Sequence, residues 1–598
     1  MTQTAEPPVL PRGHRAALVV LLLATAALYC WDLGASGWAN AYYSAAAQAG
    51  SQDWSALLFA ATDPAGGITV DKTPAAVWLM GLSVRVFGLS AWSVLLPQAL
   101  AGVGSVWLLH NTVRRWSGPT AGLIAGVVLA VTPVAALMFR FNNPDALLVL
   151  LLIAGAYCTV RAVEHASPKW IVLAGAAVGF GFLTKMMQAF LVLPAFAVVY
   201  LVAAPTTVGR RIAHLGAAAG AMIVAGGWWV LLAELLPSGS RPYIGGSQTD
   251  SVLELALGYN GIGRLDGDEV GSVGGGAGWG QPGWARLFGG EMGDGIAWLL
   301  PAALIVLGGG LWLTRRAPRT DTTRAALLLW GLWLLVSGAV FSLMAGIIHG
   351  YYTVALAPAV AALVGIGTVT AWRRRREPAA AAVLAAATAV TAVQAALLLG
   401  QVPDWVPWLR AFVLFGGLGA AALLAVAPLA PKAYAGAVAV GALVLALAAP
   451  AAYSLATAAQ PHSGALPSPG PATTGGLRFA GGLLGAPTPG EEVVEALRAD
   501  AAGYRWAAAV VGSNNAAGYQ LAAGVPVLAV GGFNGTDPAP TLDEFVQLVA
   551  DGRIHWFISG STMRGETGSD AAQRIAEWVA QHHTPTTVDG VTLYDLSR

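Results

Sequence analysis

The stretch YYTVALAPAVAALVGIGTVTAWRRRR, residues 351–376, decides the class of fold. Its apolar part has about 20 residues, the length that an α-helix needs to cross the hydrocarbon core of a bilayer. Four consecutive arginines, Arg373 to Arg376, end the stretch. Because lysine and arginine gather at the cytoplasmic ends of membrane helices, the stretch also predicts which way this helix points.

Similar apolar runs fill most of the first 455 residues. The chain of 598 residues is 56% hydrophobic and only 11% charged, whereas a soluble domain has roughly 25% charged residues. We therefore predict an all-α polytopic membrane protein with about thirteen transmembrane helices. The expected spans are residues 16–33, 92–112, 119–138, 144–163, 169–183, 186–204, 212–236, 296–314, 325–346, 351–371, 379–400, 409–428 and 433–455. The stretch 74–90, interrupted by Arg85, is predicted to be a re-entrant or surface helix.

The positive charges predict the orientation of these helices. Arginine pairs at 114–115 and 210–211 fall on the same side as Arg373 to Arg376, and the other side holds few lysines and arginines outside long loops. The positive-inside rule then places the amino terminus in the cytoplasm and the residues after 455 outside. The first apolar run is expected to stay in the protein as an anchor rather than to be removed as a signal peptide.

Composition divides the chain into three regions. Residues 1–455 are predicted to form the membrane body, with two long external loops at 34–91 and 237–295. Residues 456–485, rich in proline, glycine, serine and alanine, are predicted to be a flexible linker. In residues 486–598 short apolar strands alternate with helix-like segments, which predicts a small external α/β domain.

Polar and ionisable residues lie at the external ends of the predicted helices. An ionisable residue at bilayer depth costs about 2.5–3.5 kcal/mol, so it usually faces a cavity or a site. Each residue alone has a structural explanation, as when Asp145 caps a helix after Pro144, but their convergence on one boundary favours a shared cavity. The group comprises Asp71, Lys72, Arg140, Asn142, Asn143, Asp145, Lys185, His349, Tyr351 and Tyr352.

The residue types indicate what such a cavity can bind. Lys72, Arg140 and Lys185 can neutralise a phosphate, and a lipid phosphate would reach them at the membrane edge. A neighbouring carboxylate can act as a base toward a hydroxyl or amine. Tyrosines such as Tyr42 offer faces for sugar rings, although aromatic residues are common at any membrane interface.

Other kinds of chemistry find less support. The glycine runs at 271–283 and 531–535 lack the spacing and the lysine of a P-loop, so no soluble cofactor is predicted. The sequence leaves room for a divalent metal but indicates none, since no histidine or cysteine cluster has metal-ligand spacing. No basic domain or arm suggests nucleic acid. Cys30 and Cys158 lie inside apolar runs, so we expect no disulfide.

Several motifs together resemble a known group of enzymes. They are DKTP (71–74), FRFNNPD (139–145), LTK (183–185) and H-x-Y-Y (349–352), with RPYIGGS (241–247), LALGYNGIGR (255–264), EMGDGIAWLLPAAL (291–304), VGSNNAAGYQLA (511–522) and GGFNGTDPAPTL (531–542). Over nearly the whole chain the pattern resembles the GT-C glycosyltransferases. Within them it is similar to the protein mannosyltransferase and aminoarabinose transferase superfamily, glycosyltransferase family 39-like, and above all to the bacterial YkcB-like enzymes.

The resemblance implies an inverting transfer of a hexosyl or pentosyl group from a polyprenyl-phosphate donor to an acceptor outside the plasma membrane. The acceptor would be a cell-wall polysaccharide, a lipid or a protein. Carried over residue by residue, the donor phosphate would be bound by Lys72, Arg140, Lys185, His349 and Tyr352. Asp71 and Asp145 would be catalytic, and the sugar or acceptor would contact Asn40, Tyr42, Tyr43, Asn142, Asn143 and Tyr351.

One position departs from the family pattern. The first loop reads GWANAYY, residues 37–43, and relatives carry an acidic residue, roughly W-A-N-E-Y-Y, where this chain has Ala41. A methyl group cannot accept a proton, so three explanations stand side by side. The residue is a deliberate inactivating substitution, the base has moved to Asp71 or another carboxylate, or the protein binds without catalysing.

Two further functions compete with a glycosyltransferase. A transporter or flippase of lipid-linked sugars also needs many helices, but it is expected to hold its charges near the midplane and to show two related halves, which this sequence does not. A non-catalytic membrane scaffold that binds glycan would explain Ala41.

Overall fold

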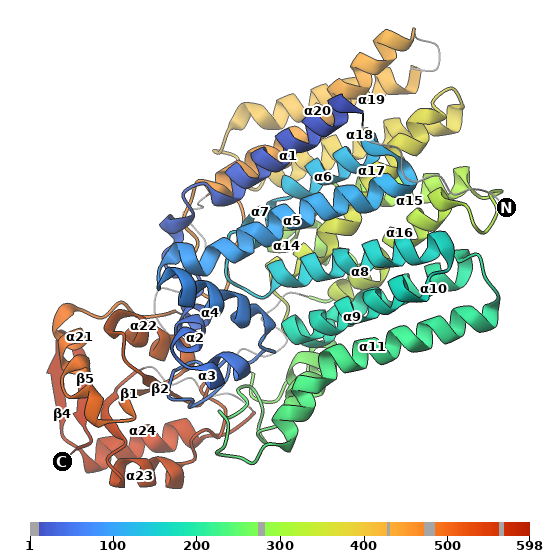
Figure 1. Cartoon of the computed structure of the whole chain (residues 1–598). Coiled ribbons are helices and arrows are strands. Elements are labelled where there is room, and N and C mark those ends of the chain that lie inside the picture. The colour runs from blue at the N-terminus through green and yellow to red at the C-terminus, as the bar shows by residue number, and fades with distance from the viewer. Residues whose placement is uncertain (1–10, 273–280, 427–430, 472–484, 561–566, 598) are drawn as a thin grey trace.

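The computed structural model describes residues 11–272, 281–426, 431–471, 485–560 and 567–597. A body of long, nearly parallel helices carries a smaller α/β domain at one end (Figure 1). We call the end of the bundle against which residues 485–597 pack the domain side. The other end is the opposite side.

Most of the expected membrane helices are present. Among the described residues ten helices are long and apolar enough to cross a membrane, or eleven when the bent pair of α14 (Gly290–Ile296) and α15 is counted as one span. The chain is thus a multi-pass membrane protein. With α9 and α10 counted together, these spans are built from α1 (Arg12–Cys30), α5 (Ala91–Ser117), α8 (Asp145–His165), α9 (Pro168–Lys185), α10 (Leu193–Ala203), α11 (Val208–Leu235), α15 (Leu300–Leu313), α16 (Thr322–Leu343), α17 (Ala357–Arg373), α18 (Pro378–Leu399), α19 (Pro407–Val426) and α20 (Lys432–Ala458).

The count differs from the expected thirteen at two places. Residues 119–138 do not form one span, because the helix stops at Val131 and restarts at Pro133, giving α6 (Pro119–Ala130) and α7 (Pro133–Met138). Proline has no backbone N–H, which interrupts the hydrogen bonds of a continuous helix. The two runs expected at 169–183 and 186–204 follow each other without a break in helical structure and are counted as one stretch, Pro168–Ala203, although they form the separate helices α9 and α10.

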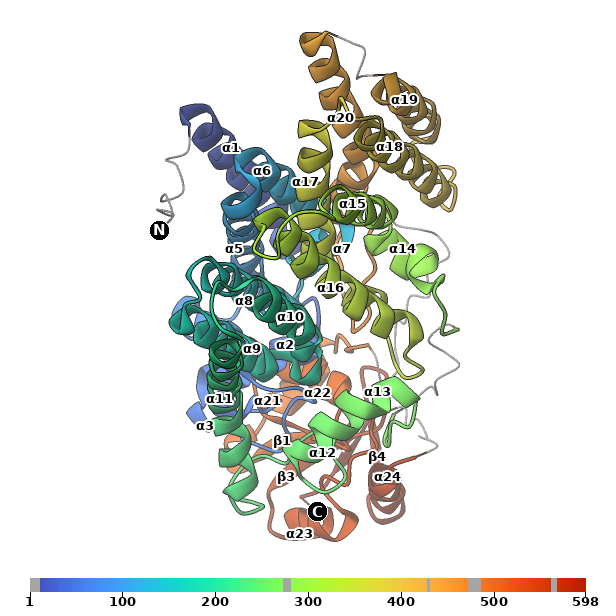
Figure 2. The ribbon, with the colours of Figure 1, turned by 90° about the vertical axis from the view of Figure 1, so that its right-hand side faces the viewer.

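That stretch nevertheless turns back on itself. Met186, at the end of α9, has a φ of 48°, and the short 3₁₀ segment η2 (Met186–Val192) leads into α10. Gly155 of α8 lies close both to Ala174 of α9 and to the ring of Phe196 of α10. Helices α9 and α10 therefore both pack against α8, as Figure 2 shows where the helices are seen almost end-on.

Glycines set the spacing between α9 and α11. A Cβ atom on Gly175 would overlap the carbonyl oxygen of Ala218, and one on Gly179 would meet the carbonyl oxygen of Met222. The matched steps along the two helices show that they run parallel. Close backbone contact through small residues is the usual way in which membrane helices pack.

The basic loops meet on the opposite side. Arg115 in the last turn of α5 forms an ion pair of 2.7 Å with Glu164 at the end of α8. Arg373 donates to the carbonyl oxygen of Ser117, and Arg319 to that of Ala204. Loops that the charge pattern assigned to one side thus lie together.

Short helices cover the domain side. The first loop folds into α2 (Ala41–Gln52), α3 (Trp54–Phe59) and α4 (Ala75–Phe87), so a helix does form where a re-entrant or surface helix was expected. Its 13 residues are fewer than a span needs, and Arg85 lies over the ring of Trp54 at 3.8 Å. The second loop contains α12 (Val252–Leu257), the π-helical turn η3 (Gly258–Ile262) and α13 (Gly263–Asp266).

The C-terminal domain is a mixed sheet covered by helices. The strand order is β2-β1-β3-β5-β4, with β2 (Val527–Val530), β1 (Trp506–Val511) and β3 (Ile554–Ile558) parallel. Strands β5 (Val591–Asp595) and β4 (Pro585–Val588) continue the sheet antiparallel. The helices are α21 (Glu491–Arg498), α22 (Ser513–Ala523), α23 (Leu542–Ala550) and α24 (Ala571–His582). Thr541 caps α23 through a capping box with Glu544.

The C-terminal domain docks on the first loop through buried polar contacts. The indole N–H of Trp506 donates to Asp63 at 2.9 Å. The side-chain amide of Gln520, on α22, donates to the carbonyl oxygens of Ala45 and Thr62. These bonds satisfy groups that burial removes from water, so the docked position is well defined.

Part of the expected linker also packs against this side. Within the described residues 459–471, the backbone N–H of Gly464 donates to Ala39 and that of His462 donates to the hydroxyl of Ser36. Residues 472–484 of the expected linker lie outside the described residues, as do residues 273–280 of the glycine-rich loop.

A substitution at the contact of α9 and α11 tests this packing. Gly175→Ala should lower the free energy of unfolding by about 1–3 kcal/mol, because the added methyl group must push the two helices apart. The measurement is the midpoint of thermal unfolding in detergent. Gly220→Ala on α11 is the matched control, since a Cβ there meets nothing within 4 Å. Equal midpoints for the two variants would contradict the close contact.

Candidate active site

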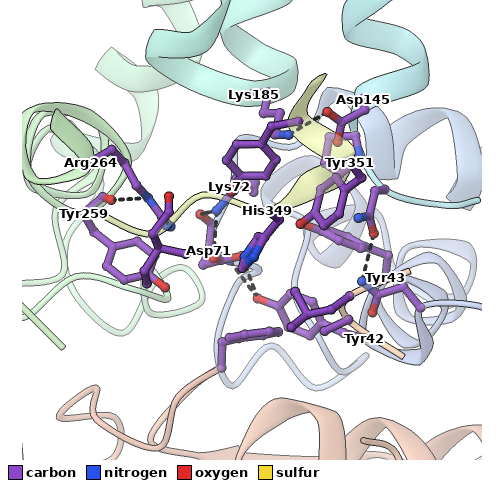
Figure 3. A pocket seen from close by; sticks show the side chains of 18 of the residues that line it. Tyr42, Tyr43, Asp71, Lys72, Asp145, Lys185, Tyr259, Arg264, His349 and Tyr351 are labelled. Atoms are coloured by element: carbon purple, nitrogen blue, oxygen red, sulfur yellow. Dashed lines mark hydrogen bonds and ion pairs between the residues drawn. The ribbon is translucent and has the colours of Figure 1, made fainter. Parts of the chain in front are cut away.

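A cavity opens between the domain side of the bundle and the C-terminal domain (Figure 3). Four segments far apart in the sequence converge on it: the first loop, the start of α8 with the end of α9, the second loop, and the residues before α17. Most residues that the sequence assigned to the site line this cavity. They are Asn40, Tyr42, Tyr43, Asp71, Lys72, Asn143, Asp145, Lys185, His349, Tyr351 and Tyr352.

Lys72 and Asp71 form a buried ion pair on the first loop. The ammonium of Lys72 lies 2.8 Å from a carboxylate oxygen of Asp71 and 2.8 Å from the amide oxygen of Asn260. The backbone N–H of Asp71 donates to the hydroxyl of Tyr42 at 2.8 Å. Burial lowers the pKa of Lys72, and the neighbouring Asp71 opposes that shift. The pair is anchored to both loops and to α2.

Lys185 and Asp145 form a second pair between α9 and α8. The ammonium is 2.7 Å from Oδ1 of Asp145 and 3.8 Å from the centre of the Tyr352 ring. Oδ2 of Asp145 is buried and has no hydrogen-bond partner among the described residues. A buried carboxylate oxygen without a partner is costly, so a ligand group that donates a hydrogen bond there would be favourable.

Arg264 adds a third cation that the sequence did not single out. Its guanidinium lies 3.2 Å from Glu269, donates to the carbonyl oxygens of Tyr259 and Ile347, and stacks 4.6 Å from the Tyr259 ring. Arg264 and Tyr259 line the cavity, whereas Glu269 lies behind the arginine. Both lining residues belong to the LALGYNGIGR motif. The sequence identified this motif but did not assign its side chains to the site.

The tight path of this motif depends on glycine. A Cβ on Gly263 would approach the carbonyl oxygens of Asp268 and Gly258 to less than 3 Å. Larger residues would open the turn and withdraw Arg264 from the cavity.

Three residues expected at the site lie off the cavity wall. Arg140 donates to the carbonyl oxygens of Leu28, Tyr29 and Ala458, at 2.9, 3.0 and 3.0 Å, and so ties three helix ends together. Because its guanidinium donates to backbone carbonyl oxygens, Arg140 has a structural role.

Asn142 likewise holds the start of α2. Its side chain accepts from the backbone N–H of Asn40 and donates to the carbonyl oxygen of Asn40 and to the hydroxyl of Ser44. These bonds orient Asn40, which does line the cavity and donates to Asn143 at 2.9 Å. Asn142 therefore positions a lining residue from behind.

Ala41 faces the C-terminal domain rather than the cavity. Its side chain belongs to a small apolar cluster with Ala45, Ala517 and Leu521. The residues on either side, Asn40 and Tyr42, line the cavity.

The remaining wall comes from the chain beyond the membrane body. Phe533 and Asn534, in the turn after β2, line the cavity together with Ala465 and Leu466 of the expected linker. The ring of Phe533 lies 5.0 Å from that of Tyr42. Phe533 and Asn534 belong to the GGFNGTDPAPTL motif, but the sequence did not place these four residues at the cavity, because hydropathy and charge do not reveal where a separate domain docks.

The cavity is positively charged overall. Among its lining residues Lys72, Lys185 and Arg264 carry positive charge, against the carboxylates of Asp71 and Asp145. Burial together with Arg264, Lys185 and Lys72 holds the pKa of His349 well below its usual range, so the imidazole is neutral. Within the described ranges no cluster of three or more histidine, cysteine or acidic side chains could hold a metal ion.

The helical body with a loop-built cavity on one side and a docked α/β domain has the GT-C fold. The same fold occurs in ArnT from Cupriavidus metallidurans, solved with undecaprenyl phosphate (TM-score 0.51, 17% identity, 98% of this chain and 97% of ArnT covered). The apo form of ArnT gives a TM-score of 0.50.

The chain belongs to the family of YkcB-like putative mannosyltransferases. It is 32% identical to the putative mannosyltransferase YkcB of Bacillus subtilis, over 94% of this chain and 91% of YkcB. Identity to the putative mannosyltransferase YycA of the same organism is 31%, over 96% and 94% of the two chains. Family models match residues 71–230 (dolichyl-phosphate-mannose-protein mannosyltransferase) and residues 493–582 (putative mannosyltransferase YkcB-like, C-terminal).

We expect the docking of the C-terminal domain to depend on pH through Asp537. Its carboxyl accepts from the backbone N–H of Gly246 at 2.7 Å. Burial, followed by the negative charges of Asp71 and Glu254, raises its pKa to about 8. An exposed aspartate has a pKa of about 3.9, so the docked state binds the extra proton between about pH 4 and about pH 8. Stability should therefore fall as pH rises through this window.

The pH dependence can be measured by thermal unfolding of the full chain in detergent at about pH 5 and about pH 8.5. Asp537→Asn cannot lose a proton, so its midpoint should fall less than that of the unchanged protein. Asp543→Asn, at an exposed position, is the control. If the unfolding midpoint of Asp537→Asn falls between the two pH values by as much as that of the unchanged protein, Asp537 does not titrate in this range.

Proposed function

We propose that the protein transfers a sugar from a polyprenyl-phosphate donor to an acceptor hydroxyl or amine on the domain side of the membrane. The observation that carries the proposal is the group of three buried cations, Lys72, Lys185 and Arg264, around one cavity beside the membrane helices. A phosphate at the membrane edge is the ligand that such a group suits.

The family and the fold support the lipid-phosphate part of the proposal. One matching family model is named for a dolichyl-phosphate-mannose-dependent enzyme, and ArnT, which shares the fold, was solved with undecaprenyl phosphate. Both observations concern other proteins. In this chain the cavity is lined by Lys72, Lys185 and Arg264, whose charges suit a phosphate.

The chemistry follows from the charges of the cavity. As the acceptor attacks the anomeric carbon, with inversion, the bond to the phosphate oxygen breaks and negative charge grows on the departing lipid phosphate. Lys72, Lys185 and Arg264 would stabilise that charge, which preorganised cations do most effectively in a site closed to water. A carboxylate would take the proton of the acceptor.

Asp145 is the residue that we propose as this base, with Asp71 holding Lys72 in place. Oδ2 of Asp145 has no partner within the described part of the chain, whereas both oxygens of Asp71 contact a neighbour, Lys72 or Tyr42. Of the three explanations for Ala41, this choice favours a base that has moved to another carboxylate.

The orientation and the acceptor are part of the same proposal. The domain side would be the extracytoplasmic face of a bacterial plasma membrane, with the amino terminus in the cytoplasm, because the basic loops lie at the opposite side. The acceptor would be an extracytoplasmic glycan, lipid or protein. The three regions 1–455, 456–485 and 486–598 would serve as catalytic membrane domain, linker and external domain.

Binding of undecaprenyl phosphate to the detergent-solubilised protein tests the phosphate site. Lys72→Met and Arg264→Met should each weaken binding by about tenfold or more, since each loses a charge-assisted contact. Lys169→Met, at an exposed position at the start of α9, is the matched control. If Lys72→Met and Arg264→Met bind undecaprenyl phosphate as tightly as Lys169→Met and the unchanged protein, the cavity is not a phosphate site.

Ala41→Glu and Asp145→Asn together locate the base. Ala41→Glu should not raise the rate of sugar transfer, because residue 41 packs against Ala517 and Leu521 outside the cavity. Asp145→Asn should lower it by about 10²–10⁴-fold. The assay follows transfer from undecaprenyl-phosphate sugars. A rate that rises sharply in Ala41→Glu would identify position 41 as the missing base, and donor binding without transfer in all forms would favour a scaffold.

A further inference from the structure

The turn between β2 and α23 closes the cavity on the side away from the membrane helices. In this turn, residues 531–537, three glycines with positive φ, Gly531, Gly532 and Gly535, fold the backbone tightly. Phe533 and Asn534 lie at its tip and line the cavity. The turn is the only part of the C-terminal domain, as far as it is described, that does so.

Asn534 lies next to the cation group. Its side-chain amide donates to the hydroxyl of Tyr259 at 3.2 Å and to the carbonyl oxygen of Gly271 at 3.0 Å. The ring of Tyr259 is 4.6 Å from the guanidinium of Arg264 and 5.8 Å from the ammonium of Lys72. The side chain of Tyr259 therefore lies between the amide of Asn534 and two of the cations, those of Arg264 and Lys72.

Phe533 forms an aromatic surface with Tyr42 on the same side. Their ring centres are 5.0 Å apart with an angle of 60° between the planes. Figure 3 shows Tyr42 toward the C-terminal domain, with Lys185 and Asp145 toward the membrane helices. The cavity thus has a charged end near the membrane and an aromatic and amide end beyond it.

We propose that Phe533 and Asn534 form the subsite for the sugar of the donor, and that the C-terminal domain thereby determines which sugar is accepted. The proposal rests on the proposed function, because a donor sugar is joined directly to the phosphate that the cations bind. The first wall beyond the phosphate must then contact the sugar. An amide can donate to and accept from sugar hydroxyls, and aromatic side chains give large, rigid apolar surfaces.

The turn is held in place independently of any ligand. The hydroxyl of Thr536 donates to the carbonyl oxygen of Gly271 at 2.6 Å, and the side chain of Gln248 donates to the carbonyl oxygen of Thr536. With the bond between Gly246 and Asp537, these contacts attach the turn to the second loop of the membrane body. A subsite fixed in this way can select between sugars, because the misfit of a wrong sugar is not absorbed by movement.

The test compares two kinds of lipid on the full chain in detergent. The probes are undecaprenyl phosphate without sugar and a panel of undecaprenyl-phosphate mannose, glucose, galactose and arabinose. At least one sugar-bearing lipid should bind more tightly than the bare phosphate. Phe533→Leu and Asn534→Ala should each reduce that advantage by about tenfold and leave binding of bare undecaprenyl phosphate unchanged.

The control is Gln520→Ala, which removes two docking bonds of the C-terminal domain away from the cavity. If Gln520→Ala reduces the sugar advantage as strongly as the cavity variants, the effect is one of docking and the proposal is wrong. The proposal is also wrong if the advantage survives in both cavity variants, or if bare and sugar-bearing lipids bind the unchanged protein equally. Failure of every lipid to bind would instead overturn the proposed function.

Discussion

Buried charge pairing is the constraint on which the site depends. The ammonium of Lys185 and the carboxylate of Asp145 lie 2.7 Å apart, almost without exposure to solvent. Removing one partner of such a pair leaves an uncompensated buried charge, at a cost of about 3–5 kcal/mol. The pair fixes the end of α9 against the start of α8, and the glycine contacts of α9 with α11 carry that position through the bundle. The end of the cavity that holds Asp145 and Lys185 is thus built into the membrane helices themselves.

The membrane body could be predicted from the sequence because its signals are local. A run such as 351–371 carries both the length and the apolar character of a helix, and Arg373 to Arg376 mark its end. One feature escaped this reasoning: a proline at 133 divides one run into two short helices. The reversal near Met186 agrees with the two spans expected at 169–183 and 186–204.

The site could be predicted in part for a similar reason. Lys72, Asp145 and Lys185 stand out as charges in apolar surroundings, and they do line the cavity. Arg140 and Asn142 have the same signature, yet their hydrogen bonds go to backbone groups. The sequence does not distinguish a polar residue that faces a ligand from one that binds a backbone carbonyl oxygen, because both lie at a membrane boundary. Phe533 and Asn534 belong to the GGFNGTDPAPTL motif, but the sequence did not assign them to the cavity, because their place depends on how a distant domain docks.

The origin of the cavity wall has a consequence for how the protein is made. Lys72, Asp145 and Lys185 are synthesised early, whereas the turn at 531–537 lies near the end of the chain. A growing chain can therefore assemble the cation group in the membrane long before Phe533 and Asn534 exist to close it. The complete cavity wall forms only when residues 485–597 have folded and packed against the first loop. A chain truncated before residue 531 would then hold a cavity without this wall.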